Sequence, residues 1–185
     1  MAVLGVDIGN TGAVALIDDE SGELLDVCDM PCLDDGPKGR PALNAALLAV
    51  IVAKAGASQA YVEWVGPRPT DGAVQAFAFG RCKGVVEGVL AARGVSVAFL
   101  TPPQWKRLVG IAPGKAGAKD AARSEAIRRW PGKAALFALK KSDGRAEAAL
   151  IAVAGLKRAA SHVEGERDHG HLSVGQAAPR PIGAS

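Results

Sequence analysis

Residues 1–17 have the sequence MAVLGVDIGNTGAVALI. Two short apolar runs, residues 2–8 and 13–17, flank the tetrad Gly9-Asn10-Thr11-Gly12. Apolar runs of this length on either side of a glycine-rich turn predict a β-hairpin. Asp7 is unusual in the first strand, because burying a carboxylate in an apolar strand costs free energy unless its charge is compensated. It either braces the turn, an ordinary use of aspartate, or belongs to a site.

The apolar pattern beyond the hairpin predicts an alternation of strands and helices. Further strands are expected at 24–30, 61–65 and 95–100, and helices at 43–55, 73–93, 119–130 and 143–160. The first three strands are joined by short connections and can pair antiparallel, whereas the later strands are joined through helices. This order predicts an α/β fold with a mixed sheet flanked by helices. Residues 161–185 are rich in glycine and proline without apolar periodicity, so we expect one domain at 1–160 and a flexible tail.

The composition favours a protein of the cytoplasm without a membrane segment. No part of the chain has the pattern of a secretion signal or a bilayer span. The three cysteines, Cys28, Cys32 and Cys82, form no even-numbered disulfide framework. A zinc site that combines Cys28 and Cys32 with His169 and His171 is conceivable, but ordinary packing is the favoured interpretation of these cysteines.

The charges are distributed unevenly along the chain. Residues 1–36 contain nine acidic residues and no lysine or arginine, whereas residues 102–158 contain thirteen basic residues against four acidic ones. Any single lysine or arginine is ordinarily a solvated helix residue. Their clustering indicates a surface for a polyanion such as nucleic acid.

Three further carboxylates stand out. Glu63 is flanked by apolar residues, although the exposed face of an alternating strand would also explain it. Asp143 and Glu147 lie one turn apart at the start of a predicted helix, where Asp143 could simply serve as a helix cap. Together with Asp7, these acids could converge on two divalent cations. Magnesium suits such an all-oxygen ligand set.

Several segments, taken in order, resemble the active-site segments of RuvC-type Holliday-junction resolvases, especially phage-like members. They are Gly5-Val6-Asp7-Ile8-Gly9-Asn10-Thr11-Gly12, Val62-Glu63, residues 77–84 (FAFGRCKG), residues 101–106 (TPPQWK) and residues 140–148 (KKSDGRAEA). The resemblance spans roughly residues 1–156. It implies a ribonuclease H-like fold with a five-stranded mixed sheet, a homodimer, and Mg²⁺-dependent hydrolysis of phosphodiesters in Holliday junctions or other branched DNA. Two Mg²⁺ ions per active site are implied, with Mn²⁺ as a substitute.

The resemblance also implies roles for individual residues. Asp7, Glu63, Asp143 and Glu147 match the metal-binding, catalytic acids. Lys106 and Lys119 match lysines near the scissile phosphate, with Lys115 a rival for the second position. We predict that DNA is contacted by a set of basic residues: Arg81, Lys83, Lys106, Lys115, Lys119, Arg128 and Arg129.

The sequence departs from the family in two places. Well-known members end with two aspartates three residues apart, whereas Asp143 and Glu147 are four apart. Some members also insert an aromatic wedge a few residues after the strand glutamate, where this chain has Gly66-Pro67-Arg68-Pro69. Trp64 is the nearest aromatic residue, and we predict that it packs in the core.

Two other functions compete with the nuclease. The segment Asp-Ile-Gly-Asn-Thr-Gly (7–12) also resembles the first phosphate motif of actin-like small-molecule kinases, although such kinases need a second comparable domain. A catalytically silent module that binds branched DNA would use the same basic surface. It would have no reason to keep all four acids.

Overall fold

The structure is a computed structural model that describes residues 1–34, 41–66, 70, 72–112 and 118–169. For residues 118, 119 and 163–169 it describes the backbone alone. Within these ranges, no helix is both long enough and apolar enough to cross a membrane. The predicted tail falls largely outside them, so its flexibility stays a prediction.

A five-stranded sheet in the order β3-β2-β1-β6-β7 forms the centre of the fold. The first three strands are antiparallel neighbours, and β6 and β7 continue the sheet parallel to β1. The strands are β1 (Ala2–Asp7), β2 (Ala13–Asp18), β3 (Leu24–Asp29), β6 (Gln59–Glu63) and β7 (Ser96–Leu100). The sheet is therefore mixed, as the sequence predicted.

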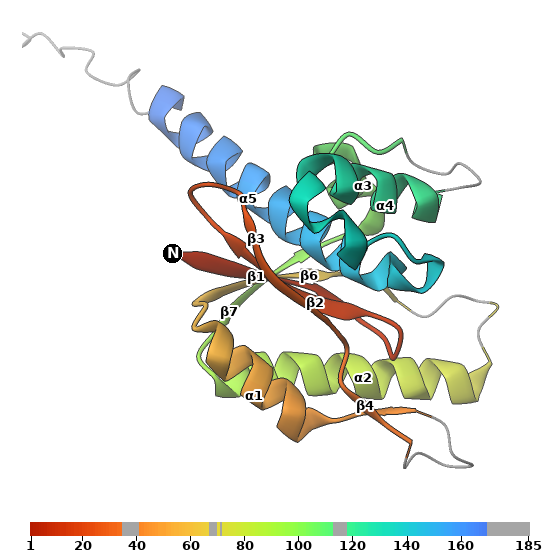
Figure 1. The fold of residues 1–185 in the computed structure, drawn as a ribbon. Helices are drawn as coiled ribbons and strands as arrows, with labels where there is room; N and C mark the ends of the chain where they lie inside the picture. The colour runs from red at the N-terminus through yellow and green to blue at the C-terminus, as the bar shows by residue number, and fades with distance from the viewer. Residues whose placement is uncertain (35–40, 67–69, 71, 113–117, 170–185) are drawn as a thin grey trace, which may run out of the picture.

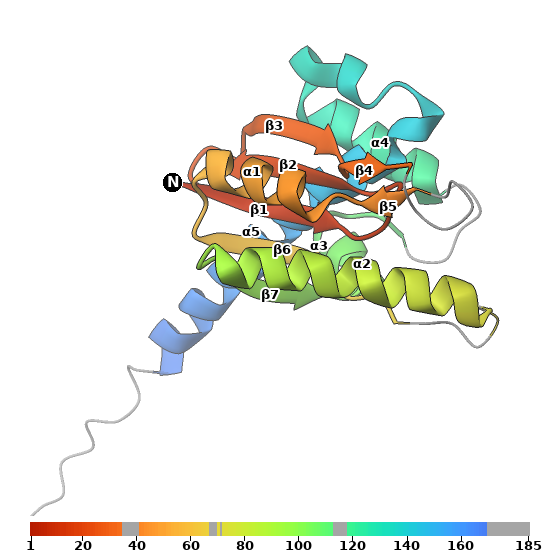
Figure 2. The same ribbon diagram turned by 90° about the horizontal axis from the view of Figure 1, so that it is seen from below.

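Helices cover both faces of the sheet (Figure 1; Figure 2). Two helices, α1 (Ala45–Ala55) and α2 (Ala73–Ala92), pack on one face, where residues such as Leu48 and Val86 meet alternate residues of β1 and β6. The other face carries three helices: α3 (Pro102–Leu108), α4 (Ala118–Arg129) and α5 (Asp143–His169). The chain thus buries two apolar clusters, one on each side of the sheet.

The main differences between the observed and the predicted elements concern β6, α5 and three elements that were not predicted. Strand β6 begins and ends two residues earlier than predicted, so Glu63 is its last residue. Helix α5 extends to His169, beyond the predicted end at Ala160. A short strand pair, β4 (Cys32–Leu33) with β5 (Ala42–Leu43), was not predicted. Helix α3 was also missed, because Pro102 and Pro103 indicated only the end of a strand, although proline is well tolerated in the first helical turn.

Short turns connect the helices on the second face. The 3₁₀ segments η2 (Pro131–Leu136) and η3 (Lys140–Ser142) link α4 to α5. Phe137, between them, is fully buried and lies 6.0 Å from Trp130, measured between ring centroids. After η2 and η3 the chain crosses the sheet again as α5, which begins beside the turn that follows β1.

Candidate active site at the carboxyl edge of the sheet

Asp7 and Glu63 end two neighbouring central strands. Strands β1 and β6 are parallel, with Val6 in register with Val62. The residues that follow this pair, Asp7 and Glu63, therefore lie side by side at the carboxyl edge of the sheet. Their side chains are only 9% and 8% exposed. The exposed-strand explanation for Glu63 is wrong, because both neighbouring strands and the helices above them cover it.

The strand alternation places both acids on the same face of the sheet. In β1, Val3 belongs to the apolar cluster under α5, whereas Leu4 and Val6 belong to the cluster under α1 and α2. Since successive side chains point to opposite faces, Asp7 shares the face of Val3. The same alternation in β6 places Glu63 with Tyr61 on the α5 face.

The turn after Asp7 provides the surface on which α5 begins. Gly9 has a φ of +142°, a conformation that L side chains rarely adopt, and the Gly12 amide donates to the Gly9 carbonyl at 3.0 Å. A Cβ atom on Gly144 would lie 2.5 Å from the carbonyl oxygen of Thr11. The first turn of α5 therefore rests directly on this turn, which brings Asp143 and Glu147 to the edge that holds Asp7.

The close approach continues one turn further along α5. A Cβ atom on Gly5 would lie 2.0 Å from the carbonyl oxygen of Ala148 and 2.8 Å from the Cβ of Ala152. Only glycine at position 5 permits this spacing. Because Glu147 precedes Ala148, the same contact holds the Glu147 backbone above β1.

Two side chains that the sequence reasoning missed contact these acids. The Trp105 indole, which is fully buried, donates its Nε1–H to Glu63 Oε1 at 2.7 Å. The Arg123 guanidinium of α4 forms an ion pair with Asp143, with 3.0 Å between Nε and Oδ1. Arg123 also pairs with Asp120 and donates to the carbonyl of Ala138. No sequence signal pointed to either contact, because the partners lie far apart along the chain.

A third ion pair holds the start of α5 on the sheet. Arg145, between the two acids of α5, makes two hydrogen bonds to the Asp29 carboxylate, of 2.6 and 2.7 Å. This guanidinium lowers the pKa of Asp29, mainly through the hydrogen bond, and Asp29 in turn raises the pKa of Arg145. The end of β3 is thereby tied to α5 at the same edge as the acids.

The donor chemistry of the four acids suits Mg²⁺, since carboxylate oxygens are its preferred protein ligands. Two of them are buried at neighbouring strand ends, where a cation would compensate the burial of charge. In the part of the chain that the structure describes, no three Asp, Glu, His or Cys side chains are gathered closely enough to form a metal centre. The conceivable zinc site stays untested, because the side chain of His169 and the whole of His171 lie outside the described part of the chain.

The predicted DNA-contacting cations in the described part of the chain lie on three helices, α2, α3 and α4. Lys106 follows Trp105 on α3, with its Nζ 5.2 Å from the centre of the indole ring. Arg81 and Lys83 lie on α2, where Arg81 lines a hollow together with Asn10 of the turn that follows β1. The backbone of Lys119 is at the start of α4, its side chain is outside the described part, and Lys115 lies outside it altogether.

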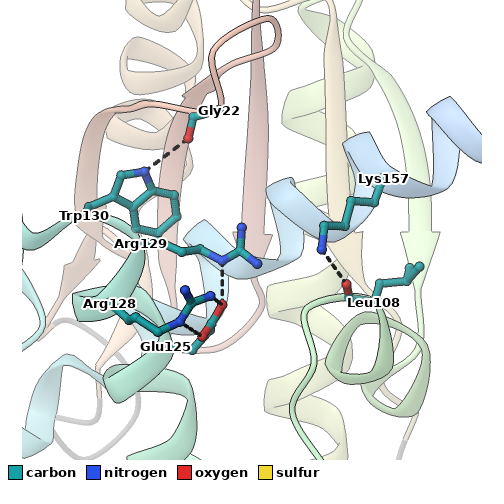
Figure 3. Close-up of polar contacts among 7 residues, drawn as sticks. All are labelled: Gly22, Leu108, Glu125, Arg128, Arg129, Trp130 and Lys157. Carbon is teal, nitrogen blue, oxygen red and sulfur yellow. Dashed lines mark hydrogen bonds and ion pairs between the residues drawn. The ribbon is translucent and has the colours of Figure 1, made fainter.

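Arg128 and Arg129 lie at the other end of α4. Their guanidinium groups contact the Glu125 carboxylate at 2.8 and 2.7 Å (Figure 3). The next residue, Trp130, donates its indole N–H to the carbonyl of Gly22, in the turn between β2 and β3. That turn is at the edge of the sheet opposite to Asp7 and Glu63.

The prediction that Trp64 packs in the core is wrong. Trp64 directly follows β6 and is 47% exposed. One edge of the indole meets Phe99, with 4.9 Å between ring centroids, and the Lys83 ammonium lies 3.5 Å from its centre. The strand ends before Trp64, so α2 and β7 cover only part of the ring.

The mixed sheet and its two helical layers define the class of protein: the fold is ribonuclease H-like, as the resemblance predicted. Among solved structures, it is similar to RuvC from Thermus thermophilus in complex with a Holliday junction substrate, at 19% identity and a TM-score of 0.58. That match covers 87% of this chain and 96% of the other. A second Thermus thermophilus RuvC structure matches at 20% identity and a TM-score of 0.56, over 89% and 97% of the two chains. No protein-family model and no curated protein sequence matches.

Proposed function

We propose that this protein is a metal-dependent endonuclease that cuts branched DNA, such as a Holliday junction. The observation that carries the proposal is the pair of buried carboxylates, Asp7 and Glu63, at neighbouring strand ends beneath the acidic start of α5. Support comes from the similarity in fold to RuvC, one structure of which is described as a complex with a Holliday junction substrate.

In this mechanism Asp7, Glu63, Asp143 and Glu147 hold the divalent cations, for which we propose two Mg²⁺ ions. When bound, these ions supply Lewis-acid activation of water and stabilisation of the leaving oxygen. A water oxygen would bond to phosphorus as one P–O bond of the DNA backbone breaks; the water would release a proton to solvent, and the leaving oxygen would take one up. The protein would orient the phosphate through cationic side chains.

We assign that role first to Lys106 of α3. It is adjacent to Trp105, whose indole contacts Glu63. An ammonium group there would offset the charge that develops on the phosphate oxygens. Lys119 or Lys115 would act similarly, and Arg81 and Lys83 would bind DNA farther from the cut. The internally paired Arg128 and Arg129, at the opposite edge, would contribute less.

The kinase alternative is not favoured. Its phosphate-binding turn would be residues 9–12, but Thr11 and Gly12 are packed against Gly144 at the start of α5. The silent-module alternative differs from our proposal only in catalysis, so a cleavage assay separates the two.

The test is a cleavage and binding assay on a synthetic four-way junction, with Mg²⁺ or with EDTA. The wild type should cut only with Mg²⁺. Glu63→Gln and Asp143→Asn should each lower the cleavage rate about a hundredfold or more, because a lost metal ligand removes several kcal/mol of transition-state stabilisation. Junction binding should persist or tighten slightly, because one negative charge near the phosphates is removed.

Glu23→Gln is the matched control, since Glu23 is exposed at the opposite edge of the sheet. It should cut like the wild type. A wild-type protein that binds junctions without cutting them would identify a silent module. A protein that neither binds nor cuts them would exclude the proposed substrate.

A further inference from the structure

We infer that Trp105 is a positioning residue for Glu63, and that its indole N–H sets the orientation in which this carboxylate binds a divalent cation. The inference rests on the proposed function and adds a residue to it. Trp105 is not one of the predicted site residues, and it is 42 positions away from Glu63 in the sequence.

The contact has the geometry of a strong hydrogen bond. The distance of 2.7 Å between Nε1 and Oε1 is short for an N–H donor and is typical of bonds to an ionised acceptor. Trp105 is 0% exposed and Glu63 is 8% exposed, so water competes little for either partner. In such surroundings a hydrogen bond is electrostatically stronger than in water, so this donor favours one orientation of the carboxylate.

Helix α3 in turn holds the indole. The backbone amide of Thr101 donates to the side chain of Gln104 at 2.9 Å, which caps the first turn. At the other end, Lys157 of α5 donates to the Leu108 carbonyl at 3.0 Å (Figure 3). The ring itself packs in the apolar cluster beneath α5. Trp105 therefore cannot turn away from Glu63 without moving α3.

This arrangement couples two functions within one helix. Trp105 orients an acid that we assign to the metal, and the next residue, Lys106, supplies a cation that we assign to the phosphate. Groups that hydrogen bond to metal ligands commonly change metal affinity 10–100-fold when removed. Loss of the indole N–H should therefore weaken metal binding without weakening the binding of DNA in the absence of metal.

The structure offers a matched control in Trp130. This indole is also buried and also donates its N–H, but to the backbone carbonyl of Gly22 at 3.1 Å, at the opposite edge of the sheet. Trp105→Phe and Trp130→Phe thus remove the same group from similar surroundings. Only the first removes a donor to Glu63.

The experiment measures Mn²⁺ binding to the full chain by titration calorimetry, together with junction binding in EDTA and junction cleavage. Trp105→Phe should weaken Mn²⁺ binding about tenfold or more. It should raise by a similar factor the Mn²⁺ concentration needed for cleavage. Trp130→Phe should leave both values unchanged, and neither variant should alter junction binding in EDTA.

If Trp105→Phe does not fold, benzothienylalanine at position 105 replaces the indole N–H by sulfur in a ring of nearly the same shape. Equal Mn²⁺ affinity in the folded Trp105 and Trp130 variants would overturn the inference while the proposed function stands. A wild-type protein that neither binds Mn²⁺ nor cuts junctions would overturn the proposed function itself, and the assignment of Trp105 with it.

Discussion

Asp29 and Arg145 form an ion pair that joins β3 to the first turn of α5. Because Arg145 lowers the pKa of Asp29 below its ordinary value of 3.8, the pair stabilises the folded state above that pH. The contribution is lost as the pH falls through the lower pKa of the folded state. The Asp29 side chain is 63% exposed, which limits the stabilisation to less than about 1 kcal/mol.

We therefore predict that Asp29→Asn lowers the melting temperature slightly at pH 7, and that the difference from wild type shrinks as the pH approaches 3. Thermal unfolding at a series of pH values measures this. Arg145→Gln should cause a similar loss, and the double variant should lose little more than either single one. An undiminished difference at acid pH would show that the effect of Asp29→Asn is not electrostatic.

At the scale of elements, the contact between α5 and β1 determines where two of the acids lie. There is no room for a side chain at position 5, since a Cβ atom there would collide with the carbonyl oxygen of Ala148. We predict that Gly5→Ala destabilises the fold by about 1–3 kcal/mol or more, as overpacking typically does. Cleavage should also fall in protein that remains folded, because α5 must lift and carries Glu147 with it.

Gly88→Ala is the control for this prediction. Gly88 is exposed in the middle of α2, and no atom lies within 4 Å of a Cβ built on it. Alanine there should raise stability by up to about 1 kcal/mol through helix propensity. Chemical denaturation of both variants compares the two effects, and equal stabilities would mean that α5 adapts to a side chain at position 5.

At the scale of the whole molecule, α2 has an exposed apolar face. Phe77 is 76% exposed and Val74 is 67% exposed, and both line a hollow together with Asn10 of the turn that follows β1. The resemblance implies a homodimer, and a junction with two symmetric scissile phosphates suits a two-fold pair. We propose α2 as the contact. We predict a dimer in solution that Phe77→Glu weakens more than tenfold, since a buried phenylalanine contributes about 2 kcal/mol.

Sedimentation equilibrium with and without junction DNA measures the assembly. Leu25→Glu, a change at an exposed leucine of the edge strand β3, should leave the dimer intact. A wild-type protein that is monomeric both free and on DNA would contradict the predicted dimer.

Local patterns in the sequence were sufficient to predict the mixed sheet and most of the helices, and they led to the proposal of the four acids. Apolar periodicity and turn residues act over a few positions, so they indicate elements such as β1, β2 and α2 directly. Asp7 and Glu63 were noticed because a carboxylate within an apolar strand is costly unless it is compensated. Helix α3 was missed because Pro102 and Pro103 were interpreted only as the end of a strand, although proline is also common in the first turn of a helix.

Tertiary packing alone decided how the acids are held. Trp105 meets Glu63, Arg123 meets Asp143 and Arg145 meets Asp29 across gaps of 42, 20 and 116 positions. Each contact depends on where a helix crosses the sheet, and thus on close approaches such as that of Gly5 to Ala148. The sequence by itself determined which side chains we propose for the chemistry, because residue type and neighbouring residues can be seen in the sequence alone. Only tertiary packing brings each of these acids next to the side chain that contacts it. The distance between two elements depends on all the side chains packed between them.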